Sequence, residues 1–293
     1  MKSKEGYIDF KGFKTYYIIY GDLDNGKTPL VALHGGPGYT HYYLENLSKL
    51  ANDGGAVVLY DQLGCGKSDR PDNPKLWTID LFVQELKAIR EALKLDKINL
   101  LGQSWGGTLA LEYMFTKPKG VEKLILSSPL LDTKIWVDEA NRLMDELPDW
   151  ASEIMKKHEV DGTTDSYEYS QAYAEFKKRH IVRAEPYPKE MIKSDSEMNS
   201  QIYNVMWGPS ETNVTGSLKN WTSLDRISEI AVPTLFISGK YDEATPKQME
   251  AGHKLVKGSK WVLLENSSHM ANLEEPDKYL AAVGDFLSSS PAE

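Results

Sequence analysis

Short apolar runs alternate with longer amphipathic runs over the first half of the chain, and the same alternation returns near its end. The runs without polar alternation are Leu30–Leu33, Ala56–Tyr60, Ile98–Gly102, Val121–Ser127, Val232–Ser238 and Lys260–Leu264. Uninterrupted apolar runs of this length are typical of strands that are buried on both faces of a parallel sheet. Two earlier runs, Tyr7–Phe10 and Lys14–Tyr20, are separated by a short Lys-Gly turn and predict an opening hairpin.

Amphipathic runs with helical spacing lie between these predicted strands. They cover Thr78–Leu93, Trp105–Phe115, Pro246–Val256 and Pro276–Leu287. In the first of them, Phe82, Leu86 and Ile89 recur every three to four positions, which places them on one face of a helix. Strands that alternate with helices in this way predict an α/β fold, with a mostly parallel sheet of eight strands and flanking helices.

The alternation stops between about Asp132 and Asn220. Apolar residues in this stretch follow helical spacing, as in the set Ala140, Leu143, Met144 and Leu147. We expect a further helix that Asp149 caps, and another over roughly Ser166–His180.

The strand pattern resumes intact at Val232, so the helical stretch is interpreted as an insert. Residues 1–131 and 221–293 then form the core, and residues 132–220 form a helical cap over the C-terminal edge of the sheet. A set of ordinary surface helices is the alternative interpretation.

The length and composition are those of an ordinary globular protein. With 293 residues, 41% of them apolar and 26% charged, the chain suits one large domain or one domain that carries an insert. Its 34 basic and 43 acidic side chains give a formal net charge of −9. This negative balance disfavours a nucleic-acid partner, because binding to phosphates requires a basic surface.

Cysteine content and the N-terminal residues bear on cofactors and location. The one cysteine, Cys65, permits no intramolecular disulfide and no Cys-rich zinc site, and we expect it to be a packing residue. No H-E-x-x-H motif and no glycine-rich phosphate loop occurs, so we expect neither a metal nor another cofactor. The first twenty residues lack the apolar core of a signal peptide, and no run approaches a membrane span. These features predict a soluble, cytoplasmic protein without a membrane partner, and its oligomeric state stays open.

The strongest local signal is the sequence Gly102-x-Ser104-x-Gly106, which lies between a predicted strand and a predicted helix. A nucleophile elbow requires this strand–turn–helix context. The flanking glycines leave room for neighbouring chain, and the helix N-terminus brings free N–H groups near developing negative charge. The motif therefore predicts that Ser104 is a catalytic nucleophile.

A serine nucleophile needs a base that takes its proton and a carboxylate that orients the base. Among the six histidines, His269 follows the last predicted strand in a small polar loop. Asp242 follows the strand before it. The chain order Ser104, Asp242, His269 is the one expected for a sheet of this kind. We therefore predict these three as the catalytic residues, with Asp132 as the alternative acid.

The loop His34–Gly38 follows the predicted strand Leu30–Leu33 and has the sequence His-Gly-Gly-Pro-Gly. Glycine N–H groups that no side chain shields can point at the oxyanion of a tetrahedral intermediate, and a proline limits the freedom of such a loop. The natural pair of oxyanion donors is the N–H of Gly36 and the N–H of Trp105, the residue after the predicted nucleophile.

Several separated motifs connect the chain with a known family. They are HGGPG at His34–Gly38, YDQLGCGKSD at Tyr60–Asp69, GQSWGG at Gly102–Gly107, NVMWGPSE at Asn204–Glu211, GKYDE at Gly239–Glu243 and SSHM at Ser267–Met270. On these motifs the chain resembles the proline iminopeptidase family of α/β-hydrolases, from about Tyr7 to Leu287. The resemblance implies that the protein hydrolyses an unblocked N-terminal residue, typically proline, from short peptides or amino-acid amides through an acyl-enzyme under a helical cap.

The resemblance also implies how the substrate amine is held. In this family, carboxylates of the cap and core bind the N-terminal ammonium, and the matching positions are Glu211 and Glu243. Tyr203 matches a family position that lines the same pocket. The chemistry agrees, because an α-amino group with a pKa of about 8 is mostly protonated at neutral pH and needs anionic partners once it is desolvated.

Three other functions remain open at the level of the sequence. The same residues could serve a broader aminopeptidase or amino-acid amidase for several small residues. A carboxylesterase or lipase would use the predicted triad without Glu211 and Glu243. A non-catalytic binding protein with a hydrolase fold would be expected to carry a broken triad, whereas this one looks complete.

Overall fold

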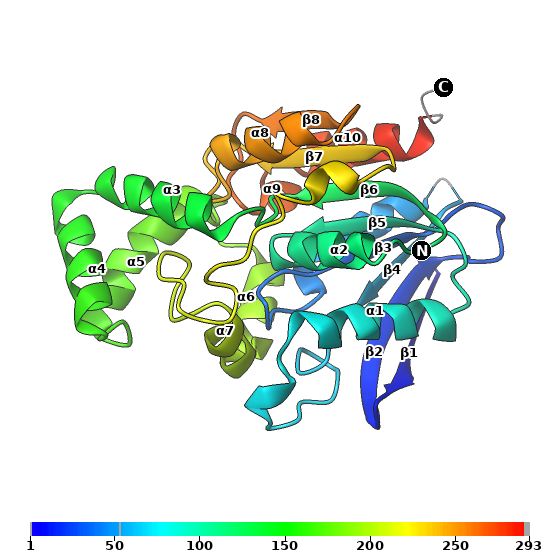
Figure 1. Ribbon diagram of the computed structural model, residues 1–293, viewed down its shortest axis with the longest axis horizontal. Helices are drawn as coiled ribbons and strands as arrows, with labels where there is room; N and C mark the ends of the chain where they lie inside the picture. The colour runs from blue at the N-terminus through cyan, green and yellow to red at the C-terminus, as the bar shows by residue number, and fades with distance from the viewer. Residues whose placement is uncertain (1, 53, 290–293) are drawn as a thin grey trace.

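A single sheet runs through the computed structural model, which describes residues 2–52 and 54–289 (Figure 1). Its strands in the described residues are β1 (Ser3–Phe10), β2 (Phe13–Gly21), β3 (Leu30–Leu33), β4 (Ala56–Tyr60), β5 (Ile98–Gln103), β6 (Val121–Ser127), β7 (Thr234–Gly239) and β8 (Lys260–Leu264). The eight strands of this described part lie in the order β1-β2-β4-β3-β5-β6-β7-β8. The β1–β2 and β2–β4 pairs are antiparallel and the others are parallel. The predicted α/β fold with a mostly parallel eight-stranded sheet is confirmed.

Two strands begin two or more residues away from the start that the apolar pattern predicts. β1 begins at Ser3, before the predicted start, because its first residues continue the antiparallel ladder and Ser3 pairs with Tyr20. β7 begins at Thr234, after Pro233 rather than at Val232. Proline has no N–H to donate to a ladder, which explains the later start.

Helices cover both faces of the sheet because its strands are apolar on both sides. In β3, Val31 and Leu33 pack into one core layer, whereas Leu30 and Ala32 pack into the other. The first layer is completed by α1 (Ile79–Ala92), α2 (Trp105–Phe115), α8 (Pro246–Leu255) and the short helix η3 (Ile227–Glu229). The second layer is completed by η1 (Tyr42–Ala51), α9 (Ala271–Glu274) and α10 (Pro276–Ser288). This arrangement leaves the carboxyl ends of the strands free for loops.

A group of helices extends from that edge of the sheet, on the left in Figure 1. They are α3 (Thr133–Asp145), α4 (Asp149–Asp161), α5 (Tyr167–His180), α6 (Lys189–Glu197) and α7 (Ser200–Met206). The chain enters and leaves them side by side, since Asp132 and Thr222 form a β-bridge and the N–H of Thr133 donates to the carbonyl of Trp221 at 2.9 Å. We propose these crossings as the boundaries of a cap that comprises residues 132–220.

The helix starts in the cap differ in part from the predicted ones. Asp149 is not an N-cap, because α4 begins at this residue and Pro148 precedes it. In the first turn of α4, its negative charge still interacts favourably with the positive N-terminal end of the helix dipole. Ser166 caps α5 by accepting the N–H of Tyr169, so the predicted start there is confirmed. The helices α6 and α7 were not predicted, and Asn199 caps the second of them.

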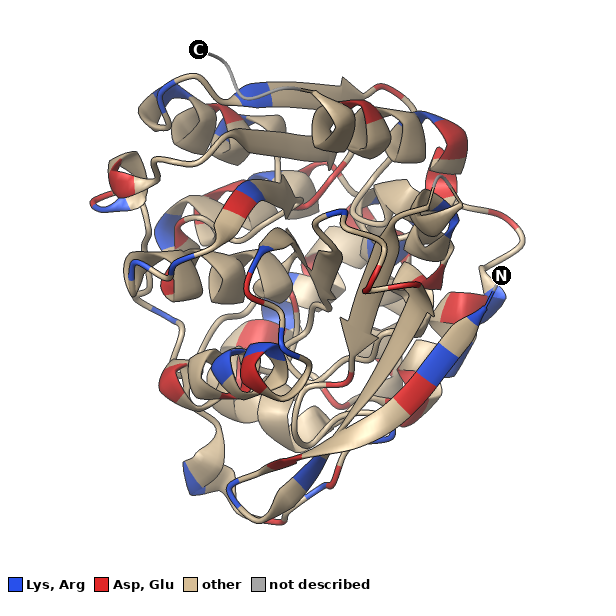
Figure 2. Cartoon of the chain, turned by 90° about the vertical axis from the view of Figure 1, so that its right-hand side faces the viewer, with Lys and Arg blue, Asp and Glu red and all other residues tan. Residues whose placement is uncertain are grey.

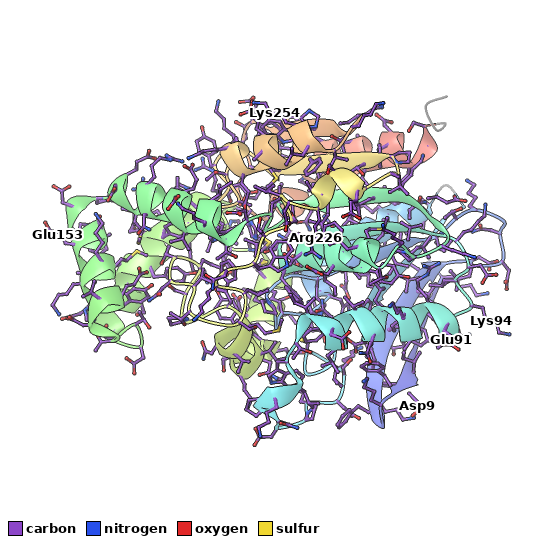
Figure 3. The ribbon with its side chains drawn as sticks, in the orientation of Figure 1. Asp9, Glu91, Lys94, Glu153, Arg226 and Lys254 are labelled. Carbon is purple, nitrogen blue, oxygen red and sulfur yellow. The ribbon has the colours of Figure 1, made fainter. Side chains whose placement is uncertain are left out.

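Charged side chains are spread over the outer surface. Figure 2 shows basic and acidic residues interspersed along the β1–β2 hairpin and on the helices around the sheet. Glu153 on α4, Lys254 on α8 and Lys94 after α1 project outward (Figure 3). Among the described residues, no helix combines the length and apolar character that crossing a membrane requires.

Candidate active site

Ser104 lies at the turn between β5 and α2, at the carboxyl edge of the sheet. Its backbone has φ 56° and ψ −124°, a conformation that residues other than glycine rarely adopt. The turn is tight because Gly106 packs against β3, where an added Cβ would lie 2.2 Å from the carbonyl oxygen of Leu33. The glycine spacing thus forms the sharp strand-to-helix turn that the sequence predicts, and Ser104 lines a cavity there.

His269 and Asp242 come together from neighbouring strand ends. Asp242 follows β7, His269 follows β8, and the Nδ1 atom of His269 lies 2.8 Å from Oδ1 of Asp242. The same aspartate oxygen accepts the N–H of Ala244 at 2.8 Å. Both side chains are buried, so water does not compete for the bond, and the bond fixes the orientation of the imidazole.

Asp132, the alternative acid, lies elsewhere in the fold. Its carboxylate caps α3, where Oδ1 accepts the N–H of Ile135 at 2.7 Å. Its main chain forms the bridge with Thr222 at the entrance to the cap. The structure therefore pairs His269 with Asp242 and not with Asp132.

Charges around His269 favour its protonated form. Burial by itself lowers the pKa of the imidazole, but the charge and hydrogen bond of Asp242 oppose burial. The carboxylates of Glu211 and Glu274 act in the same direction, so the pKa of His269 lies above its usual value. The ring of Trp136, from α3, meets the imidazole edge-on with centroids 6.0 Å apart. The cap thus covers the imidazole.

The loop after β3 lies against the turn that carries Ser104. Gly36 has φ +112°, which favours glycine, and it lines the same cavity as Ser104. The N–H of Gly35 donates to the hydroxyl of Tyr43 at 2.6 Å. Within residues 2–52 and 54–289, no hydrogen bond engages the N–H of Gly36 or of Trp105, and both residues border a small cavity beside Ser104. Two backbone donors are therefore available next to the serine.

Gln62 connects the two segments that carry these donors, and sequence analysis does not identify it. Its backbone N–H donates to Nε2 of His34 and its side-chain amide to the carbonyl of His34, each at 2.9 Å. Its Oε1 accepts the indole N–H of Trp105 at 2.8 Å. Burial lowers the pKa of His34 to about 4, so this ring stays neutral and can accept. Gln62 thereby fixes the position of both segments.

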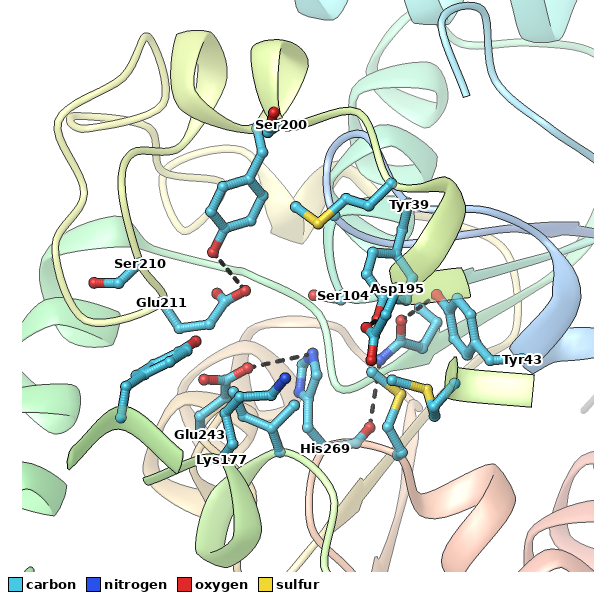
Figure 4. A pocket seen from close by; sticks show the side chains of 18 of the residues that line it. Tyr39, Tyr43, Ser104, Lys177, Asp195, Ser200, Ser210, Glu211, Glu243 and His269 are labelled. Carbon is cyan, nitrogen blue, oxygen red and sulfur yellow. Dashed lines mark hydrogen bonds and ion pairs between the residues drawn. The ribbon is translucent and has the colours of Figure 1, made fainter. Parts of the chain in front are cut away.

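A cavity of about 390 Å³ opens over Ser104 between the core and the cap. Glu211, from the loop after α7, and Glu243, from the loop after β7, face it from these two parts of the molecule (Figure 4). The hydroxyl of Tyr203 on α7 donates to Oε1 of Glu211 at 2.6 Å. The structure therefore brings the three residues predicted to bind substrate into one cavity with Ser104 and His269.

Burial raises the pKa of both cavity glutamates. For Glu243 the pKa lies well above its usual range, and the charges of Glu211 and Asp242 add to the effect of burial. For Glu211, burial outweighs the opposing effects of the Tyr203 hydrogen bond and the Lys177 charge. Oε2 of Glu243 is buried and has no hydrogen-bond partner among the described residues. Carboxylates in this condition lack the cation that would stabilise their charged forms.

Lys177, on α5, is a functional candidate that sequence analysis does not identify. It lines the cavity, and Figure 4 shows it beside Glu243. Burial lowers its pKa, while the charges of Glu211 and Glu243 oppose that shift. Lys177 lies one helical turn after Tyr173, another cavity residue. This i, i+4 spacing on the buried side of α5 is the signal that could have revealed it.

Asp195, on α6, is a second cavity residue that was not predicted. It lies across the cavity from Glu211 in Figure 4. Its carboxylate accepts hydrogen bonds from the hydroxyls of Tyr39 and, at 2.9 Å, of Tyr187. Burial raises the pKa of Asp195 to about 6. Since α6 itself was not predicted from the sequence, no signal pointed to this residue.

The end of α5 joins the cap to both loops that carry the predicted base and acid. The carbonyl of His180 accepts the N–H of Glu243 and the N–H of His269, each at 3.2 Å. The imidazole Nδ1 of His180 lies 2.9 Å from the carbonyl of Tyr241. One carbonyl of the cap is thus bonded to both loops. No group of three or more His, Cys, Asp or Glu side chains in the described chain is arranged to hold a metal ion.

Comparison with known proteins places the chain in a known family and fold. The model of a family described as alpha/beta hydrolase fold matches residues 28–276. A proline iminopeptidase of Heyndrickxia coagulans is 46% identical over 286 residues, which span 97% of this chain and 99% of that protein. The crystal structure of VinJ superposes with a TM-score of 0.94 at 38% identity, covering 97% of this chain and 98% of its own. The crystal structure of a proline iminopeptidase from Mycobacterium smegmatis gives a TM-score of 0.90 at 34% identity, with 97% of each chain covered.

Proposed function

We propose the following function because the chain belongs to the proline iminopeptidase family of α/β-hydrolases. In this proposal it is a serine aminopeptidase that releases an unblocked N-terminal residue, preferentially proline, from short peptides or amino-acid amides. The observation that carries the proposal is the shared cavity, in which Glu211 and Glu243 face the same space as Ser104 and His269.

Acylation in this mechanism begins at Ser104. Its hydroxyl attacks the carbonyl carbon of the first residue while Nε2 of His269 takes the hydroxyl proton. Asp242 holds the imidazole through Nδ1, which leaves Nε2 directed at the reaction. The N–H groups of Gly36 and Trp105 stabilise the oxyanion, and removal of one such donor costs about 3–4 kcal/mol in comparable enzymes. His269 then protonates the leaving amine, and water hydrolyses the acyl-enzyme by the reverse sequence.

Substrate recognition in this proposal depends on charge. The N-terminal ammonium lies between Glu211 of the cap and Glu243 of the core, while Tyr203 orients the first of these carboxylates. Desolvated carboxylates favour a cation over any neutral group, so a blocked N-terminus leaves them without a partner. The raised pKa values of both glutamates support this assignment, because they mark a site that is short of positive charge.

A panel of chromogenic substrates tests the proposal. We expect the highest kcat/KM for a prolyl amide, a lower value for an alanyl amide, and a loss of roughly 10⁴-fold for the N-acetyl-prolyl amide. Equal rates for prolyl and alanyl amides would instead indicate a broader aminopeptidase. A preference for a simple acyl ester over all free amines would contradict the aminopeptidase assignment and indicate a carboxylesterase.

A further inference from the structure

Negative charge is in excess at the inner end of the cavity. Glu243 and Glu211 line the cavity there, and Asp242 bonds to the Nδ1 side of the His269 imidazole, so three carboxylates act on that ring. Among the described residues that line the cavity, Lys177 is the one lysine, and it supplies a positive charge. With all three acids ionised and the imidazole neutral, negative charges outnumber positive ones. A desolvated cluster of this kind relieves the imbalance by taking up a proton.

Glu243 and His269 lie close enough for the charge of one side chain to affect the protonation of the other. Oε1 of Glu243 lies 3.7 Å from Nε2 of His269, and both side chains are buried. Because Asp242 already occupies Nδ1, Nε2 is the nitrogen that must take the proton of Ser104. The other oxygen of Glu243 is buried without a hydrogen-bond donor among the described residues. One oxygen of Glu243 thus lies against Nε2 of His269, and the other accepts no hydrogen bond from the described residues.

We propose that the free site holds a proton among Glu243, Glu211 and His269, and that a substrate ammonium expels this proton to solvent when it binds between the two glutamates. The inference rests on the proposed function, because it assigns the ammonium to that position. The exchange replaces one positive charge by another, so the buried cluster keeps its charge balance. It also leaves Nε2 of His269 unprotonated at the moment when a free N-terminus is in place.

The exchange depends on the groups that surround the glutamate pair. Those that face the pair or the imidazole are Asp242 from the loop after β7, Glu274 from α9, Tyr173, Lys177 and His180 from α5, Tyr203 from α7, and Asp195 from α6 across the cavity. Burial lowers the pKa of His180, so this histidine adds no charge near neutral pH. Burial also raises the pKa of Glu243 well above its usual range, which supports retention of a proton there.

An acetylated substrate cannot bring about this exchange. It carries no positive charge, so the proton stays in the cluster and continues to compete for Nε2 of His269. A blocked substrate should therefore react more slowly after binding, in addition to binding more weakly. Selection for a free N-terminus acts on kcat as well as on KM in this account.

Calorimetry with an amine that is not hydrolysed measures the exchange directly. L-Prolinol carries the ring ammonium but has no scissile bond, and N-acetylprolinol is its neutral control. Binding enthalpies to the wild-type protein are measured near neutral pH in phosphate, PIPES and HEPES, whose ionisation enthalpies differ. The slope of enthalpy against ionisation enthalpy counts protons, and we expect the release of about one proton per prolinol bound.

Variants of the two glutamates separate the exchange from binding alone. Glu243→Gln removes the group that contacts Nε2 of His269, so we expect weaker prolinol binding and a release well below that of the wild type. Glu211→Gln weakens binding in the same way and removes one charge that raises the pKa of Glu243, but it leaves the burial of Glu243, the larger cause, and its contact with His269 in place, so the release should exceed that of Glu243→Gln. Comparison of the two variants therefore distinguishes loss of the shared proton from loss of the clamp.

Variants of Lys177 give a second comparison on one helix. Without this cation the glutamates hold their proton to higher pH, so Lys177→Met should release more protons than the wild type about one pH unit above neutrality. Lys178→Met is the control, because the exposed Lys178 pairs with Glu175 on the surface of α5. We expect the control to match the wild type.

The pH dependence of turnover offers a test that does not use prolinol. The acid limb of kcat/KM reports the free enzyme and the acid limb of kcat reports the bound enzyme. For a prolyl amide we expect the limb of kcat at lower pH than that of kcat/KM, and for a neutral acyl ester we expect the two limbs to coincide.

The outcomes separate the two proposals. Prolinol that binds with no dependence on buffer overturns the exchange and leaves the aminopeptidase assignment intact. Prolinol that does not bind, together with equal rates for free and acetylated substrates, overturns the ammonium clamp and the exchange with it. Proton release that persists unchanged in Glu243→Gln contradicts the assignment of the shared proton to this residue.

Discussion

The core and the cap build the two sides of one cavity in different ways. The core side consists of short loops at strand ends, where backbone and side chains are held by hydrogen bonds, as in the 2.8 Å pair of Asp242 and His269. The cap side consists of longer side chains from helices and an irregular loop, and it brings Glu211 and Lys177. In the proposed function, chemistry and recognition thus come from separate parts of the fold, which implies that each can be damaged without the other.

The two parts are joined by many hydrogen bonds, and those next to the loops that carry Asp242 and His269 matter most for coupling. The carbonyl of His180 bonds to the backbones of both Glu243 and His269. Glu243 itself belongs to the core but faces the cap glutamate, and it also contacts the imidazole. In the proposed function, recognition and chemistry are therefore separable except at Glu243, which would take part in both.

Loss of the proposed nucleophile in the core should have the largest effect. We expect Ser104→Ala to lower kcat by about 10⁴-fold or more for both a prolyl amide and an acyl ester, because both reactions need the same hydroxyl. The substitution keeps a Cβ at the strained position, so the fold should survive, as circular dichroism and thermal unfolding would show. Activity within about tenfold of the wild type in a contamination-free preparation would rule out Ser104 as the nucleophile.

The core elements and the arrangement of the proposed triad residues could be predicted because they depend on local patterns. A buried strand followed by Gly102-x-Ser104-x-Gly106 needs only neighbouring residues to form its turn. The parallel order of the strands then brings the ends of β7 and β8 together, so Asp242 and His269 meet without further information. The location of Asp132 could not be settled in this way, because its role as an N-cap depends on the direction in which the chain leaves the sheet.

The cap could be predicted only as a helical segment. Its helices bury short and irregular apolar stretches, and α6 and α7 gave no periodic signal of their own. Lys177 lies on a helix that was predicted, yet a lysine on a helix is usually solvated, and only the packing of the cap on the core turns it toward Glu243. Glu211 was found through the family resemblance rather than from the residues themselves.

Truncation of the cap carboxylate should have the next largest effect and should be selective. We expect Glu211→Ala to lower kcat/KM for the prolyl amide by a few kcal/mol, about 10²- to 10³-fold, since it leaves the substrate ammonium with one partner fewer. The acyl ester should lose much less. The control is Glu153→Gln, which alters an exposed cap glutamate that points away from the molecule (Figure 3).

The loss of kcat/KM for the prolyl amide relative to the loss for the acyl ester decides whether Glu211 acts in substrate recognition. Equal losses for the amide and the ester would mean that Glu211 supports the fold or the reacting groups, and the division between cap and core would then be wrong. No loss for either substrate would place the ammonium elsewhere and strengthen the esterase alternative.

A smaller effect is expected from the residue that positions the oxyanion donors within the core. Gln62→Leu keeps the approximate size of the side chain but removes its hydrogen bonds to His34 and Trp105. We expect kcat to fall about tenfold for the amide and the ester alike, with KM unchanged, because a net hydrogen bond contributes about 1 kcal/mol and both reactions need the oxyanion site.

The converse variant tests whether Gln62 acts through the indole. Trp105→Phe removes the N–H that Gln62 accepts and leaves the backbone donor in place. The double variant should lose less than the product of the two single effects, since both remove the same bond. Fully multiplicative losses would show that the two residues act independently.

Glu85 lies in the core, and its replacement should have the smallest effect on turnover. This residue of α1 is buried, and its carboxyl group accepts the hydroxyl of Thr15 at 2.5 Å and the N–H of Leu63 at 2.9 Å. Burial raises its pKa from the ordinary 4.5 to about 8, although these hydrogen bonds act in the opposite direction. Because the folded state binds this proton more tightly than the unfolded state, Glu85 should lower the free energy of unfolding as the pH rises from about 4.5 toward 8.

Urea unfolding at a series of pH values measures that contribution. Over this window the wild type should lose at most about 1.4 kcal/mol per pH unit through Glu85, and Glu85→Gln, which stays neutral, should show a flatter dependence. Glu91→Gln is the matched control, because Glu91 is exposed on the same helix and should leave the wild-type slope unchanged. All three proteins should keep the same ratio of kcat/KM for prolyl amide and acyl ester, since Glu85 lies outside the cavity. If Glu85→Gln retained the wild-type slope, the buried proton would belong to another group, and a change in the substrate ratio would show that this part of the core is coupled to recognition after all.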